Sequence, residues 1–216
     1  MNSTFANRDS IAKRRQGLAR EAARILAQTQ SGDYQSAKQK ALRNLGLPAK
    51  TPLPRNQEIE AALFEHQQLF GGTQARQQLI ELRRSALAAM RELDIFKPRL
   101  TGSVLRGSAN SNSTVQLHLF AETIEDVGFF LQDQRIPYRH IEQRFDIGSG
   151  KKHSIPGYGL VADGVAFDLL VFSGSDRHLR PQCPVESGTM RRASANEVQL
   201  LLNSDYSQTQ EPTKGI

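Results

Sequence analysis

The residues most suited to chemistry begin with a glycine–serine turn in the middle of the chain. Gly102 and Ser103 lie at the end of a short predicted strand, and Arg106, Gly107 and Ser108 follow closely. Backbone N–H groups after such a turn, together with a serine hydroxyl and an arginine, can hold a phosphate. The alternative is that the two glycines only permit a tight connection between a strand and a helix. The turn therefore indicates either a phosphate-binding loop or a structural connection.

Polar side chains recur on one face of the strand predicted after this turn. Thr114, Gln116 and His118 alternate with apolar residues, so all three point to the same side of the strand. One interpretation makes them neutral hydrogen-bonding ligands for a base, a sugar or a peptide. The other makes them the ordinary polar face of a half-exposed strand, with His118 as a structural histidine.

A single acid, Asp168, lies in an otherwise apolar predicted strand. A buried acid needs a partner or a function, so Asp168 is either a functional residue or half of a salt bridge, with Arg106 as the candidate partner. Glu142, Arg144 and Asp146 alternate along another predicted strand. The two acids among them either replace missing ligands near Asp168 or form cross-strand charge pairs.

The Gly-Ser turn, the glycine a few residues later and the alternating strand together resemble the signature of the polymerase-beta-type nucleotidyltransferase superfamily. The resemblance covers roughly residues 74–172, and the helical N-terminal part and the Arg191–Ser194 segment resemble small bacterial nucleotidyltransferase-like proteins. It implies that the turn holds the triphosphate of a nucleoside triphosphate. It also implies that two acids on the next strand and a third on a later strand hold two Mg²⁺ ions for nucleotidyl transfer.

The chain departs from this signature at the metal-binding positions. Thr114 and Gln116 occupy the two acid positions of the strand, and Asp168 occupies the third. Two divalent ions need several shared carboxylates, so one carboxylate with a hydroxyl and an amide is a poor Mg²⁺ site. We therefore expect binding of a nucleotide, another anionic ligand, RNA or a protein without efficient catalysis. The alternative is an active transferase that moves NMP to a protein, RNA or small acceptor, with Asp168 as its catalytic and metal-binding residue.

The hydrophobic periodicity predicts an α+β fold, with a nucleotidyltransferase-like mixed sheet and packed helices preceded by an N-terminal helical arm. Helices are predicted over residues 17–30, 33–45, 56–70, 73–93, 123–134 and 194–202, and strands over 99–103, 114–120, 138–147, 153–162 and 165–172. Asp33, Asn56 and Thr123 are the predicted caps of three helices. Asp163 and Gly164 predict a two-residue hairpin turn.

These elements predict four segments: a disordered N-terminus (1–16), the helical arm (17–70), the nucleotidyltransferase-like domain (71–203) and a flexible tail (204–216). A third hypothesis assigns partner binding to the helical arm and leaves the α+β domain as a scaffold. Fold alone does not decide among the three hypotheses.

Composition narrows the class of partner. The net charge is +6 and the pI is near 9.7, which favours anionic partners such as nucleotides, RNA or an acidic protein. The apolar runs are too short to cross a membrane, and the basic residues near the N-terminus lack the apolar core of a signal peptide. Cys183 is the single cysteine, so no internal disulfide forms and a cytoplasmic location is expected.

Overall fold

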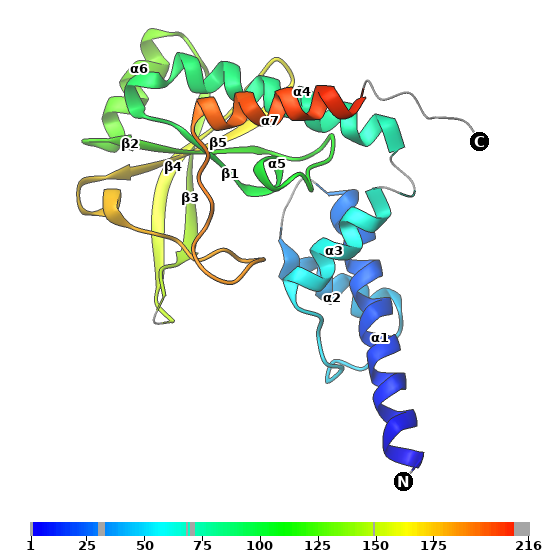
Figure 1. Cartoon of the computed structure of the whole chain (residues 1–216). Coiled ribbons are helices and arrows are strands. Elements are labelled where there is room, and N and C mark those ends of the chain that lie inside the picture. Colours follow the sequence, from blue (N-terminus) through cyan, green and yellow to red (C-terminus); the bar gives the residue numbers. More distant parts are fainter. Residues whose placement is uncertain (1, 30–32, 68, 70–71, 149, 210–216) are drawn as a thin grey trace. The chain divides into compact units, whose positions relative to one another are not determined.

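A computed structural model of the chain describes residues 2–29, 33–67, 69, 72–148 and 150–209. Over these ranges the chain forms seven α-helices and a five-stranded mixed sheet (Figure 1), which confirms the prediction of an α+β protein. It divides into two compact units, Met1–Arg76 with Pro184–Glu186 and Gln77–Cys183 with Ser187–Ile216. No helix in the described ranges combines the length and the apolar character needed to span a bilayer.

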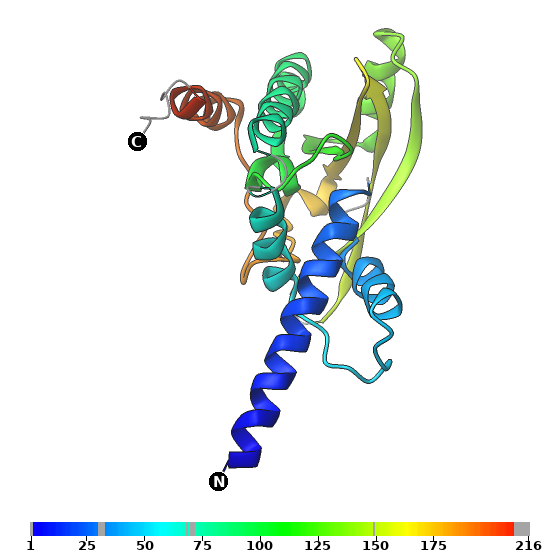
Figure 2. The same ribbon diagram turned by 90° about the vertical axis from the view of Figure 1, so that its right-hand side faces the viewer.

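The first unit is built on three helices, α1 (Asn2–Ala27), α2 (Tyr34–Asn44) and α3 (Asn56–His66). In Figure 2, α2 and α3 lie along α1, and the three share a core that includes Leu18, Ala22, Ile59 and Leu63. The structure places the segment from Asn2 to residue 16 in α1, where we predicted disorder.

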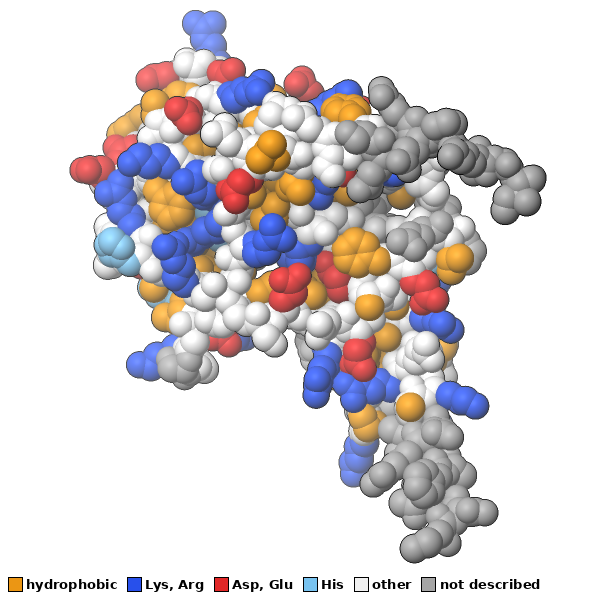
Figure 3. All heavy atoms as spheres, viewed as in Figure 1, with side chains coloured by type: hydrophobic (Ala, Val, Ile, Leu, Met, Phe, Trp, Pro, Cys, Tyr) orange, Lys and Arg blue, Asp and Glu red, His pale blue; other side chains and the backbone are white. Residues whose placement is uncertain are grey.

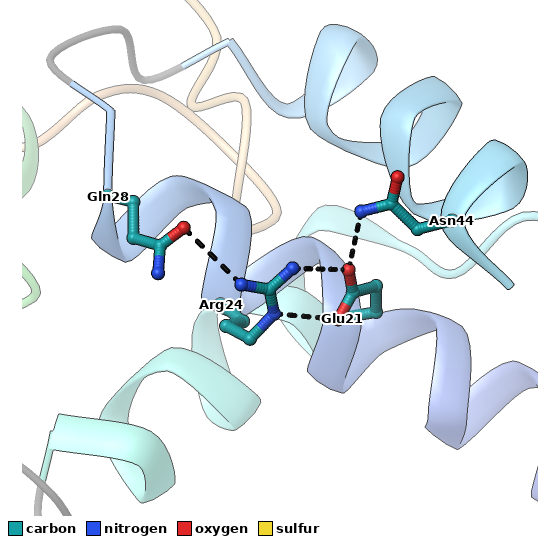
Figure 4. A network of polar contacts seen from close by, with 4 residues as sticks. All are labelled: Glu21, Arg24, Gln28 and Asn44. Atoms are coloured by element: carbon teal, nitrogen blue, oxygen red, sulfur yellow. Dashed lines mark hydrogen bonds and ion pairs between the residues drawn. The ribbon is translucent and has the colours of Figure 1, made fainter.

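A polar network on the surface of this unit joins α1 to α2 (Figure 4). The Arg24 guanidinium donates two hydrogen bonds of 2.7 and 2.9 Å to the Glu21 carboxylate, and the Asn44 amide donates another of 2.7 Å. These hydrogen bonds, the one from Arg24 first, lower the pKa of Glu21 to about 2. Glu21 therefore stays ionised at neutral pH and holds the two helices side by side.

The second unit contains a sheet in the order β1-β2-β5-β4-β3, in which β2 and β5 are parallel and all other pairs are antiparallel. Its strands are β1 (Arg99–Thr101), β2 (Val115–Ala121), β3 (Tyr138–Asp146), β4 (Lys152–Ala162) and β5 (Val165–Ser173). Its helices are α4 (Gly72–Glu92), which starts in the first unit, α5 (Gly102–Arg106), α6 (Ile124–Asp133) and α7 (Ala195–Thr209), with short 3-10 turns η2 (Asp94–Phe96) and η3 (Gly174–His178). The predicted order of helices and strands is confirmed.

One face of the sheet carries the main core of this unit. Figure 1 shows α4, α6 and α7 on the same side of the sheet, and their apolar side chains pack on the odd-numbered residues of β2 and β5. Leu117 and Leu169 are examples, with 0% and 1% of their surface exposed. Because successive side chains of a strand alternate between faces, the even-numbered residues of β2 and β5 point to the other face.

The other face carries a smaller core, formed by Phe145, Ile155, Leu170 and Phe172. The segment that follows β5 packs against this core, through Leu179 and Met190 among others. The same segment then pairs with the edge of the sheet, since Ala193 exchanges two backbone hydrogen bonds of 2.9 Å with Leu100 of β1. This segment therefore covers part of the second face and leaves the rest open.

Most of the predicted helix caps and turns are present in the structure. The Thr123 side chain caps α6, and Asp163 and Gly164 have φ values of +49° and +77°, as the hairpin prediction required. The cap predicted at Asn56 is wrong by one residue, because Arg55 is the N-cap of α3. The expected tail from residue 204 differs too: α7 continues to Thr209, and residues 210–216 lie outside the described part.

A buried arginine ties α5 to the rest of the second unit. Arg83 of α4 donates hydrogen bonds of 3.1 and 3.2 Å to the carbonyl oxygens of Val104 and Leu105, at the C-terminal end of α5. It also forms an ion pair of 2.6 Å with Asp205 of α7. This contact anchors the last turns of α7, which explains why the helix runs past its predicted end.

We predict that Arg83→Met lowers the free energy of unfolding by about 3 kcal/mol, because it removes a buried guanidinium that donates to two carbonyls and pairs with the partly buried carboxylate of Asp205. Urea denaturation measures the change. The matched control is Arg84→Met, since Arg84 is the next residue and pairs with Glu81 at an exposed position. It should cost less than about 1 kcal/mol, and equal losses in the two variants would contradict the anchoring role of Arg83.

Candidate functional site

A continuous line of residues crosses all five strands on the partly open second face. The register pairs Thr101 with Gln116, Gln116 with Asp168, Asp168 with Gly159 and Gly159 with Arg139. Directly paired residues point to the same face, so these five form one cross-strand row, which we call the Asp168 row. It brings together two residues predicted for the site, Gln116 and Asp168, that are far apart in the sequence.

The glycine–serine turn adjoins the Asp168 row at Gln116. Gly102, the first residue of α5, has a φ of +74°, and a Cβ atom there would lie 2.6 Å from Gln116 Oε1. The left-handed backbone favours glycine at this position, and the close approach shows that the Gln116 amide lies directly against the turn. The turn, the amide of Gln116 and the carboxylate of Asp168 therefore share one small area of the surface.

Asp168 is a half-buried carboxylate beside an exposed arginine. Its nearest cation is Arg139, whose Nη2 lies 4.0 Å from Asp168 Oδ1. Arg139 reaches across Gly159, where a Cβ would lie only 2.9 Å from the guanidinium carbon. The Arg139 side chain is 74% exposed, so the pair contributes little to stability.

The electrostatic environment of Asp168 does not favour its ionised form. Burial raises the pKa of Asp168 above its ordinary value, and the Arg139 charge offsets only part of that rise. The sequence proposed Arg106 as the salt-bridge partner, whereas the structure gives Arg139 that position. A carboxylate that is half-buried and weakly paired costs stability, which is typical of a residue kept for function.

The other predicted residues of the turn have different surroundings. Ser103 is half-buried, and its carbonyl accepts the N–H groups of Gly107 (2.8 Å) and Ser108 (3.1 Å), which closes the short helix. Gly107, with a φ of +91°, is its C-cap. We predicted that Ser108 contacts a ligand. Its side chain is not accessible to one in the structure, because the residue is only 2% exposed. Arg106, at the end of α5, is half-buried.

The predicted site residues of the strand, Thr114, Gln116 and His118, differ from one another in burial. Thr114 immediately precedes β2 and is half-buried, as is Gln116. His118 was expected on a half-exposed face, but it is 0% exposed. This burial agrees with the second interpretation, a structural histidine, because the segment that follows β5 covers the side chain. Arg192 from that segment donates a 2.9 Å hydrogen bond from Nε to His118 Nδ1.

The acids proposed as replacement metal ligands lie on the opposite face of the sheet. Arg139 of the Asp168 row belongs to β3, and Glu142 and Asp146 are odd numbers of residues away from it on that strand, so they point to the other side. Glu142 instead accepts a hydrogen bond from Ser154 of the neighbouring strand, and Asp146 accepts one from the N–H of Gly148 (2.8 Å). They cannot join Asp168 in one metal site.

The residues of the Asp168 row do not fit a magnesium ion. Among the described residues, no three His, Cys, Asp or Glu side chains lie close enough together to hold a metal. The positions that the family resemblance assigns to two further acids hold Thr114 and Gln116. The charged neighbour of Asp168 is Arg139. A dication requires several negative oxygen ligands, so we derive no step through Mg²⁺.

No family model matches the chain, and no curated protein sequence matches it. The side chains of the Asp168 row indicate which ligands the site can hold. An amide offers both a donor and an acceptor to a nucleobase or a peptide, and an exposed arginine offers a bidentate donor to a phosphate or a carboxylate. The Asp168 row has both in Gln116 and Arg139, with one carboxylate between them in the register.

Two residues of this face were not among the predicted site residues. Arg139 had no distinguishing signal, because its place opposite Gly159 depends on strand pairing. Arg192 lies in the Arg191–Ser194 segment that the family resemblance singled out. Its place against the sheet depends on the pairing of Ala193 with Leu100 of β1.

We predict that Asp168→Asn does not lower the free energy of unfolding at pH 7. The folded-state pKa of Asp168 is raised, so its ionised form is destabilising at neutral pH and the neutral amide removes that cost. Thermal or urea denaturation of the two proteins measures the difference. A loss of about 3 kcal/mol, as expected for breaking a buried ion pair, would show that Asp168 is structural.

We also predict that His118 makes the protein less stable below pH 6.5. Burial, and secondly the Arg192 charge, lower the pKa of His118 to about 3. The unfolded chain therefore binds a proton that the folded chain does not, between roughly pH 6.5 and 3. The free energy of unfolding should fall by about 2 kcal/mol from pH 7 to pH 5.

Denaturation at both pH values tests this prediction, with His118→Gln as the matched variant, because its amide oxygen can still accept from Arg192. The variant should lose clearly less stability over this range. Glu21 and other paired carboxylates do not interfere, since their stabilisation is lost only below about pH 4.5. An equal loss in both proteins would mean that His118 is not held neutral.

Proposed function

We propose that the second unit has a nucleotidyltransferase-like fold with a degenerate metal site, and that it binds a nucleotide without efficient catalysis. The observation that supports this most is the Asp168 row. It places the turn at Gly102, the amide of Gln116 and the carboxylate of Asp168 side by side on a partly open face. These are the positions at which the superfamily resemblance expects the triphosphate loop and two of the three acids.

The chemistry of these side chains favours binding over metal-dependent transfer. Two-metal catalysis uses carboxylates to hold both ions against the attacking and leaving oxygens. Here only Asp168 is acidic, its pKa is raised by burial, and Arg139 lies 4.0 Å from it. A positive neighbour and a poorly ionised acid both weaken the binding of a dication.

The same side chains suit an organic anion. Gln116 can form paired hydrogen bonds with a base, and Arg139 can hold a phosphate oxygen or a ribose-linked phosphate. RNA or a protein partner would use the same donors, and the net charge of +6 favours any of these anionic ligands. A free nucleotide is the simplest ligand that uses both Gln116 and Arg139.

We predict that the full chain binds a nucleoside triphosphate with an affinity that does not depend on metal. Isothermal titration calorimetry with ATP, GTP, CTP and UTP, in EDTA and then in Mn²⁺, should give dissociation constants that agree within about twofold for the ligand that binds. Thr114→Asp combined with Gln116→Asp adds two carboxylates beside Asp168 and should create Mn²⁺ dependence. Glu142→Gln is the control, because it removes an acid from the opposite face.

Three results would contradict the proposal. The first is failure of all four nucleotides to bind. The second is binding by the natural chain that requires Mn²⁺. The third is transfer of radiolabel from a nucleotide to any acceptor, with loss of that transfer in Asp168→Asn, since it would show an active enzyme.

A further inference from the structure

Arg192 lies half-buried at the end of the second face of the sheet. Its Nε donates to His118 Nδ1 at 2.9 Å, and its Nη1 donates to the carbonyl oxygen of Leu179 at 3.1 Å. Its guanidinium carbon lies 4.5 Å from the ring centroid of Phe172 and 5.2 Å from that of Phe120. The cation is therefore held by aromatic faces and by two hydrogen-bond acceptors.

Both acceptors are electrically neutral. His118 carries no charge at neutral pH, because its pKa is lowered to about 3, and Leu179 contributes only a carbonyl. Within the described part of the chain, Arg192 Nη2 is buried and has no hydrogen-bond acceptor. A buried charge normally has a counter-charge, and among the described residues no carboxylate forms a hydrogen bond or an ion pair with Arg192.

Two further arginines converge on this place. Arg99 of β1 is paired with His118 in the sheet, so it lies on the same face beside the residue to which Arg192 is bonded. Arg180 directly follows Leu179, whose carbonyl accepts from Arg192. Burial first, and then the charges of Arg180 and Arg99, lower the pKa of Arg192 to about 10. Three cations thus repel one another at one end of the sheet.

One acid stands near the group. Glu197 accepts hydrogen bonds of 2.7 Å from the N–H and the hydroxyl of Ser194, and those bonds, ahead of the charges of Arg99 and Arg191, lower its pKa. Its Oε2 atom is thus engaged in the capping box of α7, and its charge is shared between Arg99 and Arg191. Arg99 itself donates to the carbonyl of Pro98 at 3.3 Å, another neutral acceptor. The positive excess therefore remains.

The surface view agrees with this excess. Figure 3 shows Lys and Arg side chains gathered over the part of the second unit where β2 and the segment after β5 lie in Figure 1. Arginine clusters of this kind bind oxyanions, because each planar guanidinium can donate two parallel hydrogen bonds to one phosphate.

We propose that Arg99, Arg180 and Arg192, here called the arginine cluster, bind a phosphate group. A bound phosphate offsets the repulsion among the three guanidinium groups and supplies the counter-charge that Arg192 lacks. The phosphate comes from free inorganic phosphate or pyrophosphate, or from a phosphorylated ligand such as a nucleotide. The inference does not depend on the proposed nucleotide site, since phosphate alone is sufficient.

The arginine cluster is continuous with the Asp168 row. Leu100 pairs with Ala193 in antiparallel fashion, so Arg192 stands opposite Thr101, the residue at the β1 end of the row. Thr101 is in turn paired with Gln116. A ligand with its phosphate on the arginine cluster can therefore extend its remaining part over Gln116.

Titration of the full chain with pyrophosphate at low salt, followed by calorimetry, tests the arginine cluster. We expect saturable binding that weakens by about tenfold or more in Arg99→Gln combined with Arg180→Gln, and that weakens also in Arg192→Lys, which keeps the charge but loses the planar fork. The matched control is Arg144→Gln, an exposed arginine on the opposite face, which should bind like the natural chain.

Absence of pyrophosphate and phosphate binding by the natural chain would overturn the proposal, as would equal binding by the natural chain and the Arg99→Gln, Arg180→Gln protein. Circular dichroism and the melting temperature establish that the variants are folded. Because Arg180 is exposed, the single variant Arg180→Gln gives a second measurement if the others fail to fold. It must weaken pyrophosphate binding.

Two more titrations identify the source of the phosphate. If AMP and ATP bind about as tightly as phosphate and pyrophosphate, and adenosine does not bind, the arginine cluster serves free phosphate and the Asp168 row contributes nothing to nucleotide binding. If a nucleotide binds at least about tenfold more tightly, and Gln116→Ala removes that gain without affecting pyrophosphate, the two sites hold one ligand. Either result supports the arginine cluster.

Discussion

The parallel pairing of β2 with β5 is the constraint on which the candidate site depends. It sets Gln116 opposite Asp168, while the residues on either side of them, such as Leu117 and Leu169, enter the main core. A shift of the register by one residue would bury Asp168 among the helices and expose Leu169. The hydrophobic core therefore fixes the position of the polar row, although no residue of the row belongs to that core.

The two faces of the sheet differ in how well their buried polar groups are paired. On the first, α4, α6 and α7 cover apolar side chains, and Arg83 satisfies the carbonyls at the end of α5 with a charged partner of its own. On the second face, Asp168 is half-buried with a distant partner, and Arg192 is half-buried with neutral ones. Weakly paired charges that lower stability therefore lie on the second face and not on the first. Such a difference is typical of a binding surface on a stable scaffold.

Sequence reasoning succeeded where the signals are local. Caps and hairpin turns follow from a few neighbouring residues, and Thr123 and the Asp163–Gly164 turn are confirmed for that reason. Periodicity could place Asp168 in a strand, whereas its place beside Gln116 was expected only from the family resemblance, because that contact depends on the strand order β1-β2-β5-β4-β3. The burial of His118 depends on tertiary contacts in the same way, since Arg192, which bonds to it, lies 74 residues later along the chain.

The charges of the second face decide which ligand it can hold. Asp168 is the acid of its row, whereas Arg139 lies in the same row and Arg99, Arg180 and Arg192 gather beside it. A divalent cation would meet one weakly ionised carboxylate and several guanidinium groups. Its charge would increase the repulsion that already exists among the arginines. An anion meets the reverse situation, since each arginine that costs stability in the free protein becomes a donor when phosphate is bound. The neutral side chains of Thr114 and Gln116 and the arginines beside them therefore act in the same direction, since both favour an anion over a dication.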